Sequence, residues 1–390
     1  MKQIFENAKR ASRELALLTD ETRNAVLHKV AGAIAAHRQE LLEANARDLA
    51  RMEPENPLYD RLLLTESRLE GIASDMRHVA ALPSPLERVT KERTLENGLH
   101  LCRISVPFGV IGVVYEARPN VSFDVFSLCF KSGNACVLKG GKDADESNRA
   151  IVRLLHDVLE EEGINPAVVT LLPATHEATA AMLDAVGYID LCIPRGGKRL
   201  IEFVRDNARV PVIETGAGVV HAYFDKEGDL EMGKRIVNNA KTRRVSVCNA
   251  LDCLLVHRDR VNDLPELLAP MQGHVTFHYE DYGKEWMSHD LSIRIVESLD
   301  EALEHIRQYS SGHSECIITQ NPDTARRFQR EVDAACVYVN APTSFTDGAQ
   351  FGLGAEIGIS TQKLGPRGPM ALEEMTTYKW LIEGEGQVRP

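Results

Sequence analysis

The sequence has 390 residues, of which 44% are hydrophobic and 26% charged, as in an ordinary globular protein with two or three domains. Its formal net charge of -12 argues against a general binder of nucleic acids or anionic membranes, since neither would attract an acidic chain. Eight cysteines without a C-x-x-C pair or a Cys/His metal spacing fit a reducing compartment, and the N-terminus lacks the apolar core of a signal peptide. We therefore expect a cytoplasmic protein without a metal centre.

Two helical segments and a hairpin open the chain. Residues 1–52 and 65–81 carry apolar side chains at helical spacing, and prolines follow each segment, so both are predicted to be helical. The dipeptide Asn97-Gly98 lies between two extended segments and is the strongest short signal of a β-hairpin, which we place near 90–106. Such a hairpin would serve as a domain arm or as a contact between subunits.

From Gly109 to Glu214 the sequence alternates apolar strand segments with helical ones. Val110 to Tyr115 is nearly continuous in apolar residues, as expected of a buried parallel strand. Repeated βα units predict a doubly wound α/β sheet, on which ligands bind beyond the carboxyl ends of the strands. Strands are predicted at 110–115, 135–139, 168–172, 188–193 and 210–214, and helices at 120–131, 145–162, 177–186 and 198–207.

Two glycine turns leave strands of this predicted sheet. Lys139-Gly-Gly-Lys142 follows one strand and Arg195-Gly-Gly-Lys198 follows another, and neither matches a Walker A loop or G-x-G-x-x-G. Glycines at such turns let the backbone approach a phosphate, whose charge is attracted by the N-terminus of the following helix. A single turn of this kind is more often only a turn. With two of them at one edge of the sheet, a dinucleotide-binding site and two plain turns are equally well supported.

A second α/β segment follows Lys241. A glycine-rich stretch at 347–360 leads to a tail, 372–381, that is expected to return to another domain or subunit as a short strand or helix. We divide the chain into N-terminal helices with a nucleotide-binding domain (1–240), a second α/β domain (241–362) and a C-terminal segment (363–390). The later strands are predicted at 250–256, 291–296, 316–319 and 337–340, and the helices at 302–309 and 323–331.

Cys248 ends a basic, polar segment and precedes an apolar run. Basic side chains favour the thiolate, which is the nucleophilic form of cysteine, and the small polar Ser246 and Asn249 leave room for a substrate. The alternative is that Cys248 is a small buried hydrophobe, as free cysteines usually are. On spacing alone the second interpretation is favoured.

A series of longer strings runs through nearly the whole chain: Tyr115-Glu-Ala-Arg-Pro-Asn120, Lys131-Ser-Gly-Asn134, Lys139-Gly-Gly-Lys142, Ile193-Pro-Arg-Gly-Gly197, Val247-Cys-Asn-Ala250, His313-Ser-Glu315, Phe351-Gly-Leu-Gly-Ala-Glu-Ile-Gly-Ile-Ser-Thr-Gln-Lys363, Arg367-Gly-Pro-Met370 and Thr376-Thr-Tyr-Lys379. In this order they resemble the γ-glutamyl phosphate reductase family, a branch of the aldehyde dehydrogenase superfamily. The resemblance implies a Rossmann-type doubly wound cofactor domain, a second α/β catalytic domain carrying Cys248, and a small β arm for oligomerisation.

The resemblance also implies a reaction. It is the NADPH-dependent reduction of L-glutamyl 5-phosphate to L-glutamate 5-semialdehyde and phosphate, in proline biosynthesis, through a thioester on Cys248. The partners implied are a small-molecule substrate, further copies of this chain in a homo-oligomer and, as a candidate, glutamate 5-kinase. No nucleic acid or membrane partner is implied.

Site roles follow from matching positions in the family's motifs. Cys248 resembles the catalytic thiol, and the Asn120 side chain with the Cys248 backbone N–H resembles the oxyanion hole. Lys142 stands where NAD-preferring relatives carry an acid, so a lysine there suits the 2′-phosphate of NADP(H). The implied cofactor-binding residues are Lys139, Gly140, Gly141, Lys142, Arg195, Gly196, Gly197 and Glu285, and the substrate-binding residues are Arg118, Arg243, Arg244, Asn249 and Asn340.

Each role has a plainer alternative. Asn120 follows a proline and fits a helix cap, while Lys142 fits a solvated surface lysine. The arginines at 195, 243 and 244 either bind phosphate or form ion pairs, and the role of Glu214 stays open. Val245-Ser246 and Ser344 depart from the family's usual Pro-Gly or Pro-Ser and arginine.

Three other functions remain to be weighed. One is a hydrolytic aldehyde dehydrogenase acting on another semialdehyde, which would need no phosphate. The second is a nucleotide-binding kinase, against which the absence of Walker A and of a clear Asp pair for magnesium speaks. The third is a noncatalytic homologue, suggested by the departures near positions 245 and 344.

Overall fold

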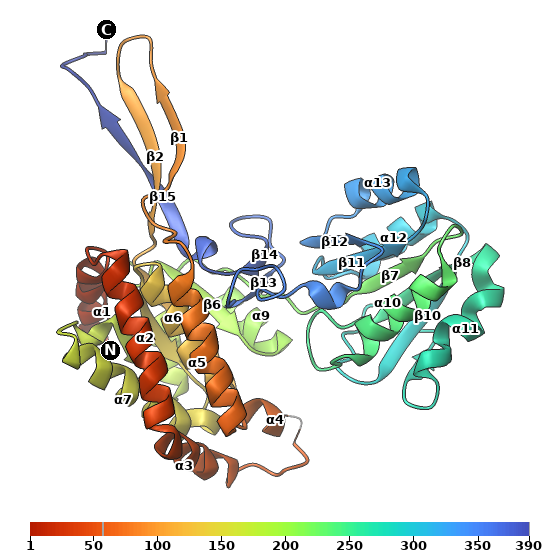
Figure 1. Ribbon diagram of the computed structural model, residues 1–390, viewed down its shortest axis with the longest axis horizontal. Helices are drawn as coiled ribbons and strands as arrows, with labels where there is room; N and C mark the ends of the chain where they lie inside the picture. The colour runs from red at the N-terminus through yellow and green to blue at the C-terminus, as the bar shows by residue number, and fades with distance from the viewer. Residues whose placement is uncertain (57, 390) are drawn as a thin grey trace. The chain divides into compact units, whose positions relative to one another are not determined.

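The computed structural model describes residues 1–56 and 58–389 and divides the chain into two compact units (Figure 1). Unit 1 comprises Met1–Glu214, Gly352–Gly358 and Met370–Pro390, and unit 2 comprises Thr215–Phe351 and Ile359–Pro369. The division falls between Glu214 and Thr215, ahead of the expected boundary at 240/241. The reason is that β7 (His221–Phe224) pairs with β8 (Cys253–His257) and β11 (Ser314–Ile318) of unit 2, which draws the segment before residue 241 into that unit.

Unit 1 is built on a four-stranded parallel sheet in the order β5-β4-β3-β6. All residues of β3 and β4 are buried, which explains why their sequences lack a polar alternation. The chain moves from β3 outward to β4 and β5 and then returns to place β6 on the other side of β3. The strands are β3 (Val110–Tyr115), β4 (Ala135–Lys139), β5 (Val169–Leu171) and β6 (Leu191–Arg195).

The segment 210–214, predicted as a strand, makes only an isolated bridge between Val212 and Cys192. Its backbone bonds with Cys192 on both sides of Val212, through Pro211 and Ile213. Proline has no backbone N–H to donate, so Pro211 limits how far the ladder can extend.

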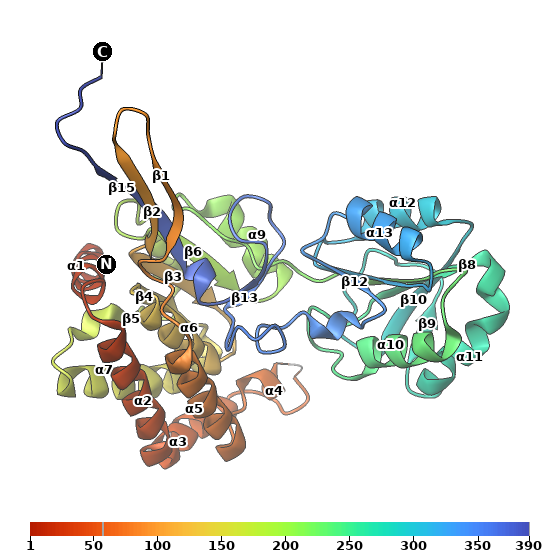
Figure 2. The ribbon, with the colours of Figure 1, turned by 45° about the horizontal axis from the view of Figure 1, so that its top comes forward.

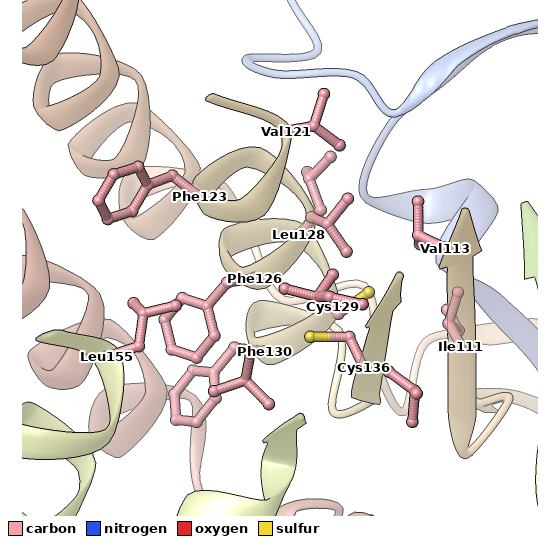
Figure 3. Packing of buried hydrophobic residues seen from close by; sticks show 14 of the residues in the cluster. Ile111, Val113, Val121, Phe123, Phe126, Leu128, Cys129, Phe130, Cys136 and Leu155 are labelled. Atoms are coloured by element: carbon pink, nitrogen blue, oxygen red, sulfur yellow. The ribbon is translucent and has the colours of Figure 1, made fainter. Parts of the chain in front are cut away.

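Helices cover the unit 1 sheet, with α6 and α7 against its strands and α2 and α5 packed on them. Figure 3 shows this core, in which Phe126, Phe130 and Leu155 point toward one another and Cys129 lies beside Cys136. The rings of Phe126 and Phe130 stack with centroids 5.1 Å apart. The helices are α1 (Lys2–Leu15), α2 (Asp20–Ala36), α3 (Arg38–Leu49), α4 (Tyr59–Leu62), α5 (Glu66–Ala81), α6 (Asn120–Lys131), α7 (Asp145–Glu161), α8 (His176–Leu183) and α9 (Lys198–Asn207).

A three-stranded antiparallel arm projects from the helices and sheet of unit 1 (Figures 1 and 2). The predicted hairpin is confirmed as β1 (Val89–Thr94) and β2 (His100–Pro107), with Gly98 at a φ of 87° in the turn. The C-terminal β15 (Thr376–Glu383) pairs with β2 along its whole length. The tail is therefore a strand of the arm and part of unit 1.

Unit 2 is a second doubly wound unit, whose six parallel strands lie in the order β12-β11-β7-β8-β10-β9. Its two apolar clusters draw on alternate residues of the central strands, as expected of a sheet covered on both faces. Strands are β7 (His221–Phe224), β8 (Cys253–His257), β9 (Thr276–His278), β10 (Asp290–Val296), β11 (Ser314–Ile318) and β12 (Cys336–Val339); helices are α10 (Leu230–Thr242), α11 (Leu264–Leu268), α12 (Leu299–Tyr309) and α13 (Pro322–Glu331). The predicted α/β fold class is confirmed in both units.

A short two-stranded sheet, β13 (Gly358–Ser360) with β14 (Gly368–Met370), completes the list of strands. All eight cysteines lie within the described residues and are free thiols. Over the same residues, no helix is both long enough and apolar enough to cross a bilayer.

Candidate active site

The carboxyl edge of the unit 1 sheet gathers most of the residues that the sequence assigned to the cofactor. Turns leave this edge after β3, β4 and β6, and they carry Glu116 to Asn120, Gly140 to Lys142, and Gly196 with Gly197. The strand order changes direction between β3 and β6, and a crevice at such a point is where doubly wound sheets bind ligands. The topology of unit 1 therefore joins the two glycine turns into one candidate site.

The turn after β4 is held open for a ligand by its glycine. A β-carbon at Gly140 would lie 2.3 Å from Nδ2 of the buried Asn148, so no larger residue fits. Asn148 is fixed by Ser122, whose Oγ donates to its Oδ1 at 3.0 Å and contacts the Tyr115 hydroxyl at 2.7 Å. This buried network keeps the backbone of the turn accessible to a phosphate or ribose.

Two lysines give this turn a positive charge. Lys139 is largely buried and its Nζ donates to the Gly140 carbonyl at 3.1 Å. Burial lowers the pKa of Lys139, and the neighbouring Lys142 charge lowers it further while Asp145 opposes this. An anionic ligand at the turn would relieve the repulsion between the two lysines, so their placement suits a phosphate.

A carboxylate already occupies the turn after β6. Oε2 of Glu116 accepts the Gly197 N–H at 3.0 Å, and a β-carbon at Gly196 would lie 2.6 Å from the same oxygen. Gly197 is the N-cap residue of α9, where backbone N–H groups and the helix dipole favour anions. Nothing in the sequence pattern singles out Glu116, because its side chain reaches a turn 81 residues away.

Arg195 lies at the end of β6, beside this turn. Its Nε is buried and has no hydrogen-bond partner among the described residues. A buried guanidinium nitrogen without a partner indicates that a polar group is missing from its surroundings. Together with the glycine cradle after β4, this unsatisfied donor fits the binding of a phosphorylated cofactor at the edge of unit 1.

Asn120 is the first residue of α6 and is half-buried. Its side chain does not cap the helix, since no capping bond is formed at the N-terminus of α6. Instead its Nδ2 donates to Oδ2 of Asp124 at 3.0 Å, one helical turn further along. Burial raises the pKa of Asp124 to about 7, opposed by the charge of Arg195. Arg118, two residues earlier, is also half-buried.

In unit 2, Cys248 lies in a loop between α10 and β8 and is half-buried. The backbone of Gly218 packs against it so closely that a β-carbon at position 218 would lie 1.7 Å from the Cys248 carbonyl oxygen. The Gly218 N–H in turn donates to Oε1 of Glu285 at 3.0 Å. Glu285, assigned by the sequence to the cofactor, thus holds the backbone that supports the cysteine loop.

Asn249 holds the other side of the loop. Its Nδ2 donates to the carbonyls of Ser344 and Thr346, at 3.4 and 2.9 Å, and its own carbonyl accepts from the Thr343 hydroxyl at 2.9 Å. Oδ1 of Asn249 is buried without a partner among the described residues. The Nδ2 of Asn249 is therefore bonded to backbone beside Cys248, and the predicted substrate contact of this residue stays a prediction.

Asn340, predicted to contact the substrate, lies at another edge of unit 2 than Cys248. It follows β12, at the carboxyl edge of the unit 2 sheet, whereas Cys248 precedes β8 at the amino edge. Its Oδ1 accepts the Thr319 N–H at 2.9 Å, its Nδ2 donates to the Thr319 carbonyl at 2.8 Å, and its φ is 55°. Asn340 therefore bridges the ends of β11 and β12, a position that gives no support to the predicted substrate contact.

The remaining sequence candidates lie near the end of α10. The side chains of Arg243 and Arg244 are exposed, and in the part of the chain that is described they form no ion pair. Ser344, at the departure from the family pattern, is buried and donates its hydroxyl to Oδ1 of Asn239 at 2.7 Å. The small Ser344 side chain therefore fills the position at which the family usually has an arginine.

A separate cluster of His221, Cys253 and His305 has the spacing of a metal site but not its chemistry. The three ligand atoms lie within 4.8 Å of one another and all three residues are buried. However, Arg294 donates to Nδ1 of His305 at 2.9 Å, so the proton of this neutral imidazole lies on Nε2 and faces Cys253 at 3.6 Å. A metal-ligating histidine donates the N–H of its second ring nitrogen to an acceptor. Here the second nitrogen of His305 faces the Arg294 guanidinium, which can only donate.

Comparisons with known proteins agree with these features. The model of the aldehyde dehydrogenase family matches residues 1–276. The γ-glutamyl phosphate reductase of Parabacteroides distasonis is 58% identical over 100% of this chain and 99% of its own, and that of Bacteroides thetaiotaomicron is 57% identical over 99% and 98%. Both relatives align along essentially their whole length.

Solved structures show the same relation. The crystal structure of γ-glutamyl phosphate reductase from Thermotoga maritima superimposes with a TM-score of 0.96 at 39% identity, covering 100% of this chain and 99% of that one. An acetylating aldehyde dehydrogenase from Geobacillus thermoglucosidasius reaches a TM-score of 0.75 at 15% identity, over 100% and 97% of the two chains, and supports the fold alone.

Proposed function

The chain belongs to the γ-glutamyl phosphate reductase branch of the aldehyde dehydrogenase family, and from this we propose its reaction in atomic terms. It reduces L-glutamyl 5-phosphate to L-glutamate 5-semialdehyde and phosphate, a step of proline biosynthesis. As a member of the family it uses a nicotinamide cofactor. The observation that carries the proposal is the half-buried Cys248, whose loop is pinned on both sides by Gly218 and Asn249.

The Cys248 thiolate attacks the carbonyl carbon of the acyl phosphate. As the carbon–sulfur bond forms, the carbonyl π electrons move to oxygen, and this oxyanion is stabilised by the Asn120 amide and the Cys248 backbone N–H. Each such donor typically contributes about 3–4 kcal/mol. The carbon–oxygen bond to phosphate then breaks, phosphate leaves with the bonding electrons and takes up a proton, and a thioester remains on Cys248.

Reduction of the thioester regenerates the thiolate. When bound, the reduced nicotinamide supplies the hydride. The same two donors hold the oxygen of the resulting tetrahedral thiohemiacetal. The carbon–sulfur bond then breaks, and the aldehyde is released as Cys248 recovers its electron pair. A sulfur nucleophile suits both steps, because a thiolate attacks and leaves easily.

The cofactor proposed is NADP(H), held along the carboxyl edge of unit 1. Lys139 and the backbone at Gly140 and Gly141 would receive the ribose, and Lys142 its 2′-phosphate. Support comes from the two adjacent lysines, whose mutual repulsion an added phosphate would relieve. Arg195, Gly196 and Gly197 would receive the pyrophosphate, and Glu285 the nicotinamide ribose.

The substrate contacts proposed include the half-buried Arg118 and the exposed Arg243 and Arg244, which lie near the two functional side chains. Arg118 precedes Asn120, while Arg243 and Arg244 precede Cys248 along the chain. The substrate carries a phosphate and a carboxylate, and a chain of net charge -12 must bind them with local cations. Asn249 and Asn340 are proposed as further substrate contacts. Asn249 keeps a buried Oδ1 without a partner among the described residues, whereas the Asn340 amide bonds the Thr319 backbone.

We propose that the arm joins copies of this chain. β15 lies at an edge of its sheet and exposes Tyr378, Trp380, Leu381 and Ile382, and an exposed apolar edge strand is a ready interface.

Glutamate 5-kinase, which makes an acyl phosphate of this kind, is the proposed supplier and partner. The usage of eight free cysteines supports a reducing, cytoplasmic location.

The reverse reaction tests the function. NADPH formation from glutamate semialdehyde and NADP is followed with and without phosphate, for the wild type and Cys248→Ala. We expect continuous turnover only when phosphate is present and the enzyme retains Cys248. Turnover without phosphate would identify a hydrolytic aldehyde dehydrogenase instead, and protection from thermal unfolding by ATP but not by NADPH would favour the kinase.

A further inference from the structure

Asp124 is an acidic residue of α6, a helix whose other side chains mostly pack in the hydrophobic core of unit 1. From Val121 to Phe130, α6 contains no other charged residue, and its remaining side chains are buried. Its neighbours on the helix, Phe123, Phe126 and Leu128, belong to the apolar cluster of which Figure 3 shows a part. Asp124 itself is half-buried, so its carboxylate loses part of its hydration at a cost in stability, and its presence calls for a reason other than folding.

Among the described residues, the Asp124 carboxylate makes one directed contact. Its Oδ2 accepts the Asn120 Nδ2–H at 3.0 Å, the spacing of residues one turn apart on a helix. The other charged groups that act on it are Arg195 at the end of β6, Asp75 on α5 and Glu356 in the segment Gly352–Gly358. All of these belong to unit 1.

The protonation state of Asp124 decides which way the Asn120 amide faces. An ionised carboxylate only accepts hydrogen bonds, so it holds Nδ2 of Asn120 toward itself and leaves the second Nδ2–H in a fixed direction. A protonated carboxyl donates instead, and it then favours the Asn120 Oδ1 on its side. The amide would turn over, and the N–H would leave its former direction.

We propose that Asp124 is a positioning residue, which orients the Asn120 amide so that its free N–H points to the developing oxyanion. The inference rests on the proposed function, because it uses Asn120 as an oxyanion donor. Burial raises the pKa of Asp124 to about 7, with Arg195 and the Asn120 bond opposing burial and the acids at 75 and 356 adding to it. The orienting bond is thus lost as the pH falls through about 7, and activity declines with it.

The competing explanation is an ordinary contact between residues four apart on a helix, which would affect stability alone. Two substitutions separate the explanations. Asp124→Asn keeps an oxygen that accepts from Asn120 but cannot titrate, and Asp124→Ala removes the acceptor. Ser127→Ala is the matched control, since its hydroxyl donates to the Asp124 carbonyl at 2.9 Å in the same helix without touching the Asn120 amide.

The expected result is a split between kcat and KM. Asp124→Ala lowers kcat by about 10–100-fold with KM values nearly unchanged, because a misplaced donor fails in the transition state. Asp124→Asn stays within about threefold of the wild type and loses the decline near pH 7. Ser127→Ala keeps both kcat and its pH profile. In the background of Asn120→Ala, adding Asp124→Ala changes nothing further, since both act through one donor.

Three results would overturn the inference: equal kcat for Asp124→Ala and the wild type, an unchanged pH profile in Asp124→Asn, or additive losses with Asn120→Ala. The rate of Cys248 alkylation against pH is measured for the same proteins, so that titration of the thiol is separated from that of Asp124. Thermal unfolding confirms that each variant is folded. If the wild type turns over with phosphate and needs Cys248 while Asp124→Ala is unaffected, this inference alone fails; if the wild type shows no such turnover, the proposed function fails.

Discussion

Gly218 approaches Cys248 so closely that a β-carbon at position 218 would stand 1.7 Å from the carbonyl oxygen of the cysteine and 3.0 Å from its Cα. Because the neighbour is backbone, it cannot rotate away as a side chain would. The cysteine loop is thus shaped by a glycine 30 positions earlier in the printed sequence, together with Glu285 and Asn249. This relationship makes the position of the nucleophile sensitive to a single methyl group.

Gly218→Ala is expected to displace the Cys248 loop. We predict a loss of about 100-fold or more in kcat, since misplacement of a nucleophile by about 1 Å has that effect, and a loss of about 1–3 kcal/mol in the free energy of unfolding. Gly32→Ala is the control, because nothing lies within 4 Å of a β-carbon there and the helix should gain about 0.5–1 kcal/mol. Wild-type kcat in Gly218→Ala would show that the contact does not position the thiol.

Lys142→Glu is expected to change the cofactor preference. Replacing the proposed 2′-phosphate contact with an acid should lower kcat/KM for NADPH by about 10²-fold and leave NADH nearly unaffected, an effect of about 3 kcal/mol. Lys91→Glu, on the arm, makes the same charge change away from the turn and should alter neither value. The preference is measured as the ratio of kcat/KM for the two cofactors. A ratio equal to that of the wild type would remove Lys142 from the cofactor site.

Glu116→Gln is expected to tighten cofactor binding. The Glu116 carboxylate accepts the Gly197 N–H at the place proposed for the pyrophosphate. Two anions at one helix N-terminus repel each other. Glutamine keeps an acceptor without the charge, so the Kd of NADP should fall by about 3–10-fold, and this gain over the wild type should shrink at high salt. Calorimetric titration at two salt concentrations measures both effects. Weaker binding would instead mean that Glu116 organises the turn for the cofactor.

The buried pair of His221 and Glu315 gives stability a pH dependence. Burial opposes a charge on His221, but the Glu315 carboxylate 3.2 Å away overrides it and raises the pKa to about 10. Folded protein therefore holds a proton that the unfolded chain releases above about pH 6.5, so this contribution is complete below pH 6.5 and is lost as the pH rises through about 10. Each pH unit in that window changes the free energy of unfolding by about 1.4 kcal/mol.

His221→Gln should flatten that decline, while the exposed His28→Gln should leave it unchanged. The sequence has two tryptophans, and replacing Trp380 of the arm by phenylalanine leaves Trp286 as a fluorescence reporter of unit 2. Urea unfolding followed at pH 7 and pH 9 then gives the slope. A slope that survives in His221→Gln would place the titration in other groups.

Much of the fold could be predicted because its signals are local. The apolar runs of β3 and β4 and the Asn97-Gly98 turn are properties of neighbouring residues, and each is confirmed within a few positions. The pairing of β15 with β2 is different, since it joins segments far apart in sequence and the tail alone fits a strand or a helix equally. The same limit explains the boundary at Glu214, which depends on where β7 finds its partners.

The candidate site, like the fold, can be predicted from the sequence only where its signals are local. The glycine turns were visible because a ligand-binding turn needs glycine at fixed places after a strand. Glu116 and Asp124 were not, since one depends on a long-range side-chain contact and the other on burial around α6. The bonds of the Asn340 amide to the end of β11 are likewise a long-range contact that the motif does not reveal, and its substrate contact stays a prediction.

The most direct test of the central claim is a single turnover without phosphate. The protein is mixed with glutamate semialdehyde and NADP, NADPH is followed, and the protein is then digested for peptide mass analysis. The account predicts about one NADPH per active site and one glutamyl group on the peptide carrying Cys248, both absent in Cys248→Ala, with release of the group when phosphate is added. Continuous turnover without phosphate, or a glutamyl group on another residue, would contradict it.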